Sequence, residues 1–165
     1  MSGFEIKNLA NPLYFEENVL PPHSDHKYYG SEAELASGCS SFKYSLNGLW
    51  HIHVARNLAE RPEGFEGSDY DCRHWDTIAV PAHIQMEGYG KPHYTNTTYP
   101  WDGHEAIVPG ELPQENPVAS YVKYFAVPEG WQDVRISFQG AETALAVWLN
   151  GHFVGYSEDS FTPSD

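Results

Sequence analysis

The sequence predicts an all-β protein, folded as an antiparallel β-sandwich, and three observations lead to this class. Several short segments alternate apolar with polar side chains, the period-two pattern of strands that bury one face. Asn150-Gly151 separates two of these segments and is a residue pair that two-residue type I′ hairpin turns prefer. Helical periodicity is nearly absent, so the strands can cover their apolar faces only by packing on one another.

The expected strands follow the chain in order. The first covers residues 49–55, where Trp50, Ile52 and Val54 alternate with two histidines. The others are expected at 76–80, 120–127, 133–138, 144–149 and 152–156. The core is expected to comprise Trp50, Ile52, Val54, Ile78, Val80, Tyr121, Phe125, Val134, Ile136, Phe138, Leu145, Val147, Phe153 and Val154.

The two histidines of the first strand, His51 and His53, share one strand face, as two metal ligands could. A metal site needs a third ligand close by, and nothing in the sequence marks one. We therefore expect both imidazoles to face solvent.

Residues 1–45 are expected to form an extended arm, and residues 46–165 the sandwich. Apolar residues in the arm occur singly or in pairs between prolines, so it cannot bury itself. It either stays mobile or lies along another surface. One short helical turn is expected at 31–36, with Ser31 as the N-cap and Glu34 at the capping-box position.

The segment from Pro81 to about residue 119 carries no strand signal, and loops of this length in compact domains are usually functional. Residues 88–101 within it combine aromatic rings and two prolines with a single asparagine, Asn96. An asparagine amide offers both donors and acceptors, which suits a neutral polyhydroxy ligand. The alternative from composition alone is a structural loop in which Asn96 caps a turn.

Composition limits the partners. The 165 residues carry a net charge of −14, from 23 acidic residues against 9 Lys and Arg. So few cations cannot form an extended basic patch, and neither nucleic acid nor an anionic membrane surface is expected as a partner. No signal peptide and no apolar run of about 18 residues is present. Cys39 and Cys72 are expected as free thiols in a reducing, cytoplasmic compartment, with one disulfide as the alternative.

Four motifs in order resemble the N-terminal domain of family 2 glycoside hydrolases, the β-galactosidases above all. The longest consists of Pro81, Gln85, Gly88, Tyr89, Pro92, Tyr94, Thr95, Asn96, Tyr99 and Pro100. The others are residues 45–50, Glu115-Asn116-Pro117 before Tyr121, and Trp148-Leu149-Asn150-Gly151 running into residues 154–160. The resemblance extends over residues 8–165, nearly the whole chain.

This resemblance implies a jelly roll of the galactose-binding type, with C-terminal strands beyond residue 165. It implies part of an enzyme that hydrolyses terminal β-D-galactose residues of lactose and related β-galactosides. The catalytic glutamates would lie on a (β/α)₈ barrel that has no room in this chain, so no catalytic residue and no activity of the chain alone are expected. Asn96 and Thr97 are expected to bind substrate, with Tyr94, Tyr99 and Pro100 supporting the loop.

Partners and cofactors follow from the same resemblance. The arm is expected to form a subunit contact in a homo-oligomer, and Mg²⁺ and Na⁺ are expected in the complete enzyme without a ligand from this chain. The alternative is a stand-alone carbohydrate-binding module or lectin whose aromatic residues form the sugar platform. Sugar affinity of the chain alone separates these two hypotheses.

Overall fold

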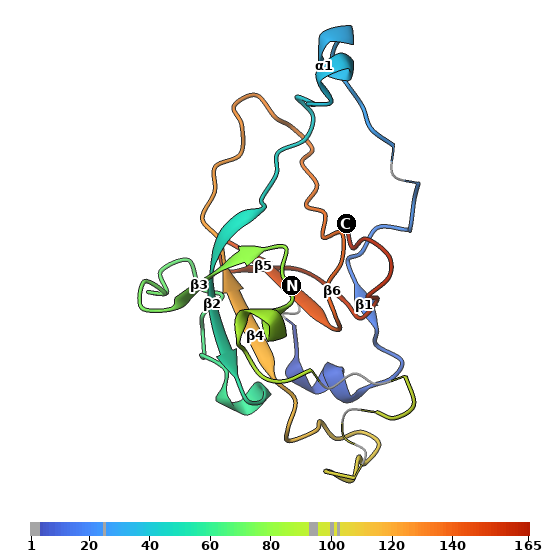
Figure 1. Cartoon of the computed structure of the whole chain (residues 1–165), viewed down its shortest axis with the longest axis vertical. Coiled ribbons are helices and arrows are strands. Elements are labelled where there is room, and N and C mark those ends of the chain that lie inside the picture. Colours follow the sequence, from blue (N-terminus) through green and yellow to red (C-terminus); the bar gives the residue numbers. More distant parts are fainter. Residues whose placement is uncertain (1–3, 25, 93–95, 100, 102) are drawn as a thin grey trace.

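The computed structural model describes residues 4–24, 26–92, 96–99, 101 and 103–165. It contains two three-stranded antiparallel sheets and little helix, which confirms the all-β class (Figure 1). One sheet has the order β3 (Asp76–Val80), β2 (Gly48–Ala55), β4 (Val118–Val122). The other has the order β1 (Glu16–Glu17), β6 (His152–Ser157), β5 (Leu145–Leu149). The helices are η1 (Ile6–Ala10), α1 (Glu32–Ser37), η2 (Leu58–Glu60) and η3 (Ile84–Glu87), and none in the described ranges could cross a membrane.

The central strand β2 determines how the chain connects its neighbours. It pairs antiparallel with both β3 and β4, so these two outer strands run parallel to each other. Val80, the end of β3, lies opposite Gly48, whereas Val118, the start of β4, lies opposite Ala55. The connection must therefore travel the length of β2, about 23 Å at about 3.3 Å per residue.

Both faces of β2 are covered by apolar groups. On one face Ile52 is 1% exposed, and Trp50 packs edge-on against Tyr121 with ring centroids 6.4 Å apart. On the other face the loop before β3 supplies Trp75, whose ring lies 5.5 Å from that of His53. Loop 56–75 is thus part of the core, although its sequence contains turn residues and no strand pattern.

The second sheet is completed by the N-terminal arm. Glu16 and Glu17 pair with Ser157 and Tyr156, which makes β1 the edge strand beside β6. The ring of Tyr14 stacks on Tyr156 at 5.3 Å, and Phe4 lies 5.2 Å from the same ring. The first part of the arm therefore lies along its own sandwich and helps to bury Tyr156, which is 2% exposed.

The rest of the arm projects away from both sheets and carries α1 at its tip (Figure 1). The side chain of Ser31 accepts a hydrogen bond from the N–H of Glu34, as predicted for the N-cap. The Glu34 carboxylate accepts hydrogen bonds from the N–H groups of Gly30 and Ser41. In a capping box the donor would instead be the N–H of the N-cap Ser31, the residue after Gly30. These bonds brace the turn from both sides.

Two local predictions are confirmed closely. The strand expected at 76–80 is β3. The hairpin between β5 and β6 turns at Asn150 and Gly151, which have φ of 51° and 80°. Positive φ at both positions is what a type I′ turn requires.

The strand expected at 133–138 is wrong. Asp133 has a φ of 53°, in the left-handed region, and Val134 is 51% exposed. Phe138 forms only an isolated bridge with Ser164. Alternation predicts which faces a strand would have, but a strand also needs a neighbour with free N–H and C=O groups. Residues 123–144 loop away from both sheets, and in the described chain the backbone pairing of this segment is limited to the Phe138–Ser164 bridge (Figure 1).

The predicted core is correct in part. Ile52 and Ile78 are buried, but Phe125 lies beyond the end of β4 and is 37% exposed. The prediction missed the buried side chains of Ala55, Cys72, Trp75, Ser120, Tyr156 and Ser157. Tyr156 packs on the arm, and Cys72 and Trp75 belong to loop 56–75; neither segment carries a periodic signal in the sequence.

Replacing Gly155 by alanine is expected to displace the arm, because a Cβ there would lie 3.0 Å from the carbonyl oxygen of Glu17. Overpacking against backbone costs about 1–3 kcal/mol. The urea midpoint should fall, and chymotrypsin should cut faster at Tyr14 and Phe15. Gly140→Ala is the control, since a Cβ at Gly140 meets nothing within 4 Å. Equal behaviour of the two variants would contradict the pairing of β1 with β6.

A second prediction concerns the ion pair that joins the arm to the last residues. His23 Nε2 lies 2.7 Å from Asp165 Oδ2, and the hydrogen bond to Asp165 raises the pKa of His23. Burial alone would raise the pKa of Asp165, but hydrogen bonds from Ser137 and His23 outweigh it and lower the value. The stability that protonated His23 contributes to the folded state is fully present below its unfolded pKa of about 6.5. It is lost as pH rises through the raised pKa of the folded state.

The stability that ionised Asp165 contributes depends on pH in the opposite direction. It is present above about pH 3.9 and is lost as pH falls through the lowered pKa of the folded state. The pair is therefore strongest between these limits. We expect the His23 ring signals in an NMR titration to shift to lower pH in Asp165→Asn, while those of His83 stay unchanged. An unaltered His23 titration would show that the pair does not form in solution.

Candidate functional site

The long connection between β3 and β4 carries the predicted substrate-binding residues. Asn96 and Thr97 lie in a turn and are both exposed, and within the described residues Asn96 makes no side-chain hydrogen bond. Tyr99, predicted to support the loop, is 75% exposed. Tyr94 and Pro100 lie outside the described residues. The structure therefore places the Asn96 amide at the surface of this loop.

The first part of the connection is fixed to β3. η3 ends at Gly88, which has a φ of 92° and so uses the conformational freedom of glycine. The next residue, Tyr89, donates its N–H to the carbonyl of Ile84 at 3.0 Å. Its hydroxyl donates to Asp76 Oδ2 at 3.1 Å, and burial together with this bond raises the pKa of Tyr89. The phenol thus remains a neutral donor that ties the loop to the start of β3.

The last part of the connection is fixed through Glu115. The indole Nε1–H of Trp101 donates to the carbonyl of Glu115 at 3.0 Å. The Glu105 carboxylate accepts from the N–H of Gln114 at 2.6 Å and from that of Glu115 at 3.2 Å. Finally, the guanidinium of Arg56 contacts the Glu115 carboxylate at 2.5 Å. Glu115 therefore joins the loop to the end of β2, since Arg56 follows the last residue of that strand.

Sequence reasoning missed most of this brace. The sequence marks Glu115 only as part of a motif and Trp101 only as the end of the aromatic stretch 88–101, and it singles out neither Arg56 nor Glu105. The donors from Gln114 and Glu115 are backbone groups, which leave no trace in residue type. Trp101 and Glu105 lie fourteen and nine positions before their partners Glu115 and Gln114, a spacing that no periodic pattern marks, so the sequence carries little signal for these contacts.

Asn96 brings an exposed, uncharged polar group to this loop. An exposed asparagine amide can donate to one hydroxyl and accept from another, as sugar recognition requires. Among the described residues no group of three or more His, Cys, Asp or Glu could hold a metal ion.

The two histidines of β2 do not both face solvent as predicted. His51 is half-buried, with its ring 6.4 Å from that of Tyr124, and its Nδ1 is buried without a hydrogen-bond partner in the described chain. His53 keeps an exposed edge but packs on Trp75. The physical cause is that two rings cover the strand face that alternation assigned to water: Tyr124, just after β4, lies beside His51, and Trp75 of loop 56–75 lies beside His53.

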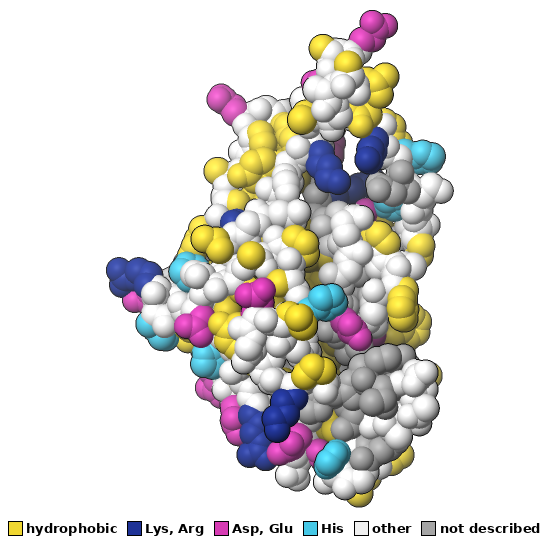
Figure 2. Space-filling model, viewed as in Figure 1, with side chains coloured by type: hydrophobic (Ala, Val, Ile, Leu, Met, Phe, Trp, Pro, Cys, Tyr) yellow, Lys and Arg dark blue, Asp and Glu magenta, His cyan; other side chains and the backbone are white. Residues whose placement is uncertain are grey.

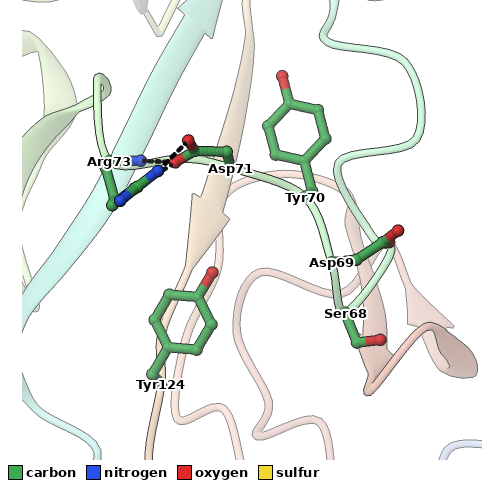
Figure 3. Close-up of a pocket in the computed structure, with 6 residues that line it drawn as sticks. All are labelled: Ser68, Asp69, Tyr70, Asp71, Arg73 and Tyr124. Carbon is green, nitrogen blue, oxygen red and sulfur yellow. Dashed lines mark hydrogen bonds and ion pairs between the residues drawn. The ribbon is translucent and has the colours of Figure 1, made fainter.

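A hollow of about 360 Å³ lies beside this loop (Figure 3). It is lined by Ser68, Asp69, Tyr70, Asp71, Arg73 and Tyr124. Arg73 donates two hydrogen bonds to the Asp71 carboxylate, from Nε at 2.9 Å and from Nη2 at 2.7 Å. This pairing holds the pKa of Asp71 well below its usual range. Arg73 and Asp71 thus pair with each other, and Ser68, Asp69 and the two tyrosines line the rest of the hollow.

Both cysteines are free, with Cys39 exposed and Cys72 buried. Cys72 Sγ lies 3.5 Å from the hydroxyl of Tyr124. The thiol prediction is therefore confirmed and the disulfide alternative is not. On the face shown in Figure 2, Lys and Arg side chains lie in separate groups rather than in one continuous patch.

Comparison with known proteins adds a family to this geometry. The family model described as glycosyl hydrolases family 2, sugar binding domain, matches residues 43–165. The chain is 54% identical over 155 residues to a β-galactosidase of Halalkalibacterium halodurans, and 48% identical over 159 residues to one of Lactobacillus delbrueckii subsp. bulgaricus. It is 46% identical over 172 residues to the β-galactosidase large subunit of Leuconostoc lactis.

These matches cover 92%, 95% and 95% of this chain. They cover only 15%, 16% and 27% of the three relatives. The chain thus spans a minor part of the length of the relatives that it matches.

Proposed function

Because the chain belongs to glycosyl hydrolase family 2, in which it matches the sugar-binding domain, we propose that it is the sugar-binding domain of a β-galactosidase. The substrates would be lactose and related β-galactosides with a terminal β-D-galactose. The identity to several β-galactosidases over nearly the whole chain supports this proposal.

The observation that carries the proposed role is the position of Asn96. Its amide lies exposed on a loop that is fixed to β3 by Tyr89 and to β2 through Glu115. A sugar hydroxyl could replace a water molecule that solvates this amide, and no charged side chain would have to be desolvated. Thr97 would lie next to the same sugar, where its backbone groups can add a contact.

Hydrolysis itself would be carried out elsewhere in the complete enzyme. Glycosidases act with two carboxylic groups that flank the scissile bond, one as acid or base and one as nucleophile or base. In this proposal those groups belong to a barrel domain, and Asn96 supplies binding energy and orientation to the galactosyl unit. Orientation lowers the barrier because the reacting atoms meet without further loss of freedom.

The remaining proposals concern the setting of the enzyme. Two free thiols suit a reducing cytoplasm. We also propose that the complete enzyme forms a homo-oligomer with a contact from the arm, and that it holds its Mg²⁺ and Na⁺ outside this domain. The projecting part of the arm exposes Tyr28, Leu35 and Phe42, which an additional surface could cover.

Replacing Asn96 by alanine in the complete enzyme is expected to lower kcat/KM on a galactoside roughly tenfold to a hundredfold. One hydrogen bond lost in a dry site costs about 1–3 kcal/mol. The melting temperature should hardly change, since the side chain is exposed. Gln114→Ala is the matched control, because it removes an exposed amide from the same loop, while the hydrogen bond of Gln114 to Glu105 uses the backbone N–H and is kept. Parallel losses of activity and stability in Asn96→Ala would instead indicate that Asn96 braces the loop.

Titration of the isolated chain separates an enzyme domain from a lectin. We expect no measurable calorimetric binding of galactose or lactose at millimolar concentration, because Asn96 alone is too small a site. A lectin would bind through a preformed aromatic platform, and the hollow beside Tyr70 and Tyr124 is the candidate. Clear binding that Tyr124→Ala abolishes and Asn96→Ala leaves intact would favour the lectin.

A further inference from the structure

We propose that Glu105 and Trp101 are positioning residues that hold the Asn96 loop in place through the backbone of Glu115. This inference rests on the proposed function, since it names the residues that place the proposed sugar contact. It uses groups that neither touch the sugar nor belong to the loop tip.

The contacts form one connected brace. Trp101 donates its indole N–H to the carbonyl of Glu115. The Glu105 carboxylate accepts hydrogen bonds from the N–H groups of Gln114 and Glu115. Trp101 and Glu105 are also joined directly through the backbone, because the N–H groups of His104 and Glu105 both donate to the carbonyl of Trp101 at 3.0 Å. Trp101 and Glu105 are thus tied to Gln114 and Glu115, three to four residues before β4 begins at Val118.

The carboxylate of Glu105 is the stronger part of this brace. It is half-buried and accepts from two successive N–H groups, and hydrogen bonds to an ionised acceptor are roughly twice as strong as neutral ones. The Arg56–Glu115 pair adds less, since its side chains are 64% and 65% exposed and water screens it. Removing the Glu105 carboxylate should therefore loosen the loop more than removing the Arg56 guanidinium.

The position of the brace in the chain connects it to Asn96. Asn96 lies five residues before Trp101, so it stays within about 17 Å of the anchor, at about 3.3–3.6 Å per residue. Without the anchor, the free stretch would run on to the start of β4 at Val118. A shorter free stretch leaves fewer conformations to lose when the sugar binds, which is the advantage of a preorganised site.

The test is a double-mutant cycle in the complete enzyme with Glu105→Ala, Asn96→Ala and the pair. Glu105→Ala alone should lower kcat/KM on a galactoside roughly threefold to thirtyfold, because a contact displaced by 1 Å can cost up to about a hundredfold. The double variant should lose much less than the product of the single losses, since a misplaced Asn96 has little left to contribute. Glu105→Gln, which keeps one acceptor oxygen, should recover part of the activity.

Glu111→Ala is the control, because Glu111 is an exposed glutamate of the same loop without a side-chain hydrogen bond to the described chain. Hydrogen exchange followed by mass spectrometry supplies a readout that does not depend on catalysis. In Glu105→Ala, peptides covering 96–115 should exchange faster while peptides of β2 and β4 stay unchanged.

The outcomes separate the two proposals. If Asn96→Ala leaves kcat/KM unchanged, the sugar contact itself is wrong, and exchange alone then decides whether the brace exists. If Asn96→Ala is impaired but the losses multiply in the double variant, the positioning role of Glu105 is refuted. Unchanged exchange in Glu105→Ala refutes it as well, whatever the kinetics show.

Discussion

The pairing of β2 with β3 on one side and β4 on the other is the constraint on which the site depends. It makes the outer strands parallel, so the chain has to pass from one end of β2 to the other. About seven extended residues would cover that distance. The connection runs from residue 81 to 117, and most of it is therefore free to reach outward with Asn96. Because both ends are held by a hydrogen-bonded sheet, a long loop can still present one side chain at a defined place.

The second sheet depends on the arm in a similar way. Tyr156 would be exposed on β6 without Phe4 and Tyr14, and the edge of β6 would lack the partner that Glu16 and Glu17 supply. Gly155 permits this approach, since any larger residue would press on the backbone of Glu17. The boundary expected near residue 45 separates two segments by composition, but the first part of the arm contributes directly to the sandwich.

The sequence is informative where a signal is local. The Asn150-Gly151 turn, the strand at 76–80 and the cap at Ser31 each depend on neighbouring residues, and each is present in the structure. The failures at 133–138 and in the core depend on partners distant in sequence. Val134 alternates correctly but has no strand beside it, and Trp75 is buried by a sheet face that alternation assigned to solvent. Within the site, residue type alone indicated Asn96. The brace relies largely on backbone N–H and C=O groups, and since every residue except proline provides both, they leave no signal in the sequence.

The use of charge fits a neutral ligand. Cations are scarce in this chain, and those whose contacts matter here are paired with carboxylates: Arg56 with Glu115, Arg73 with Asp71, and His23 with Asp165. The turn at Asn96 and Thr97 contains no charged residue. A net charge of −14 would repel an anionic sugar over roughly 8–10 Å at moderate salt, but it exerts no such force on a galactoside without charge. Under the proposed function, recognition by an amide on a braced loop would let the domain keep a strongly acidic surface without weakening its binding of a neutral substrate.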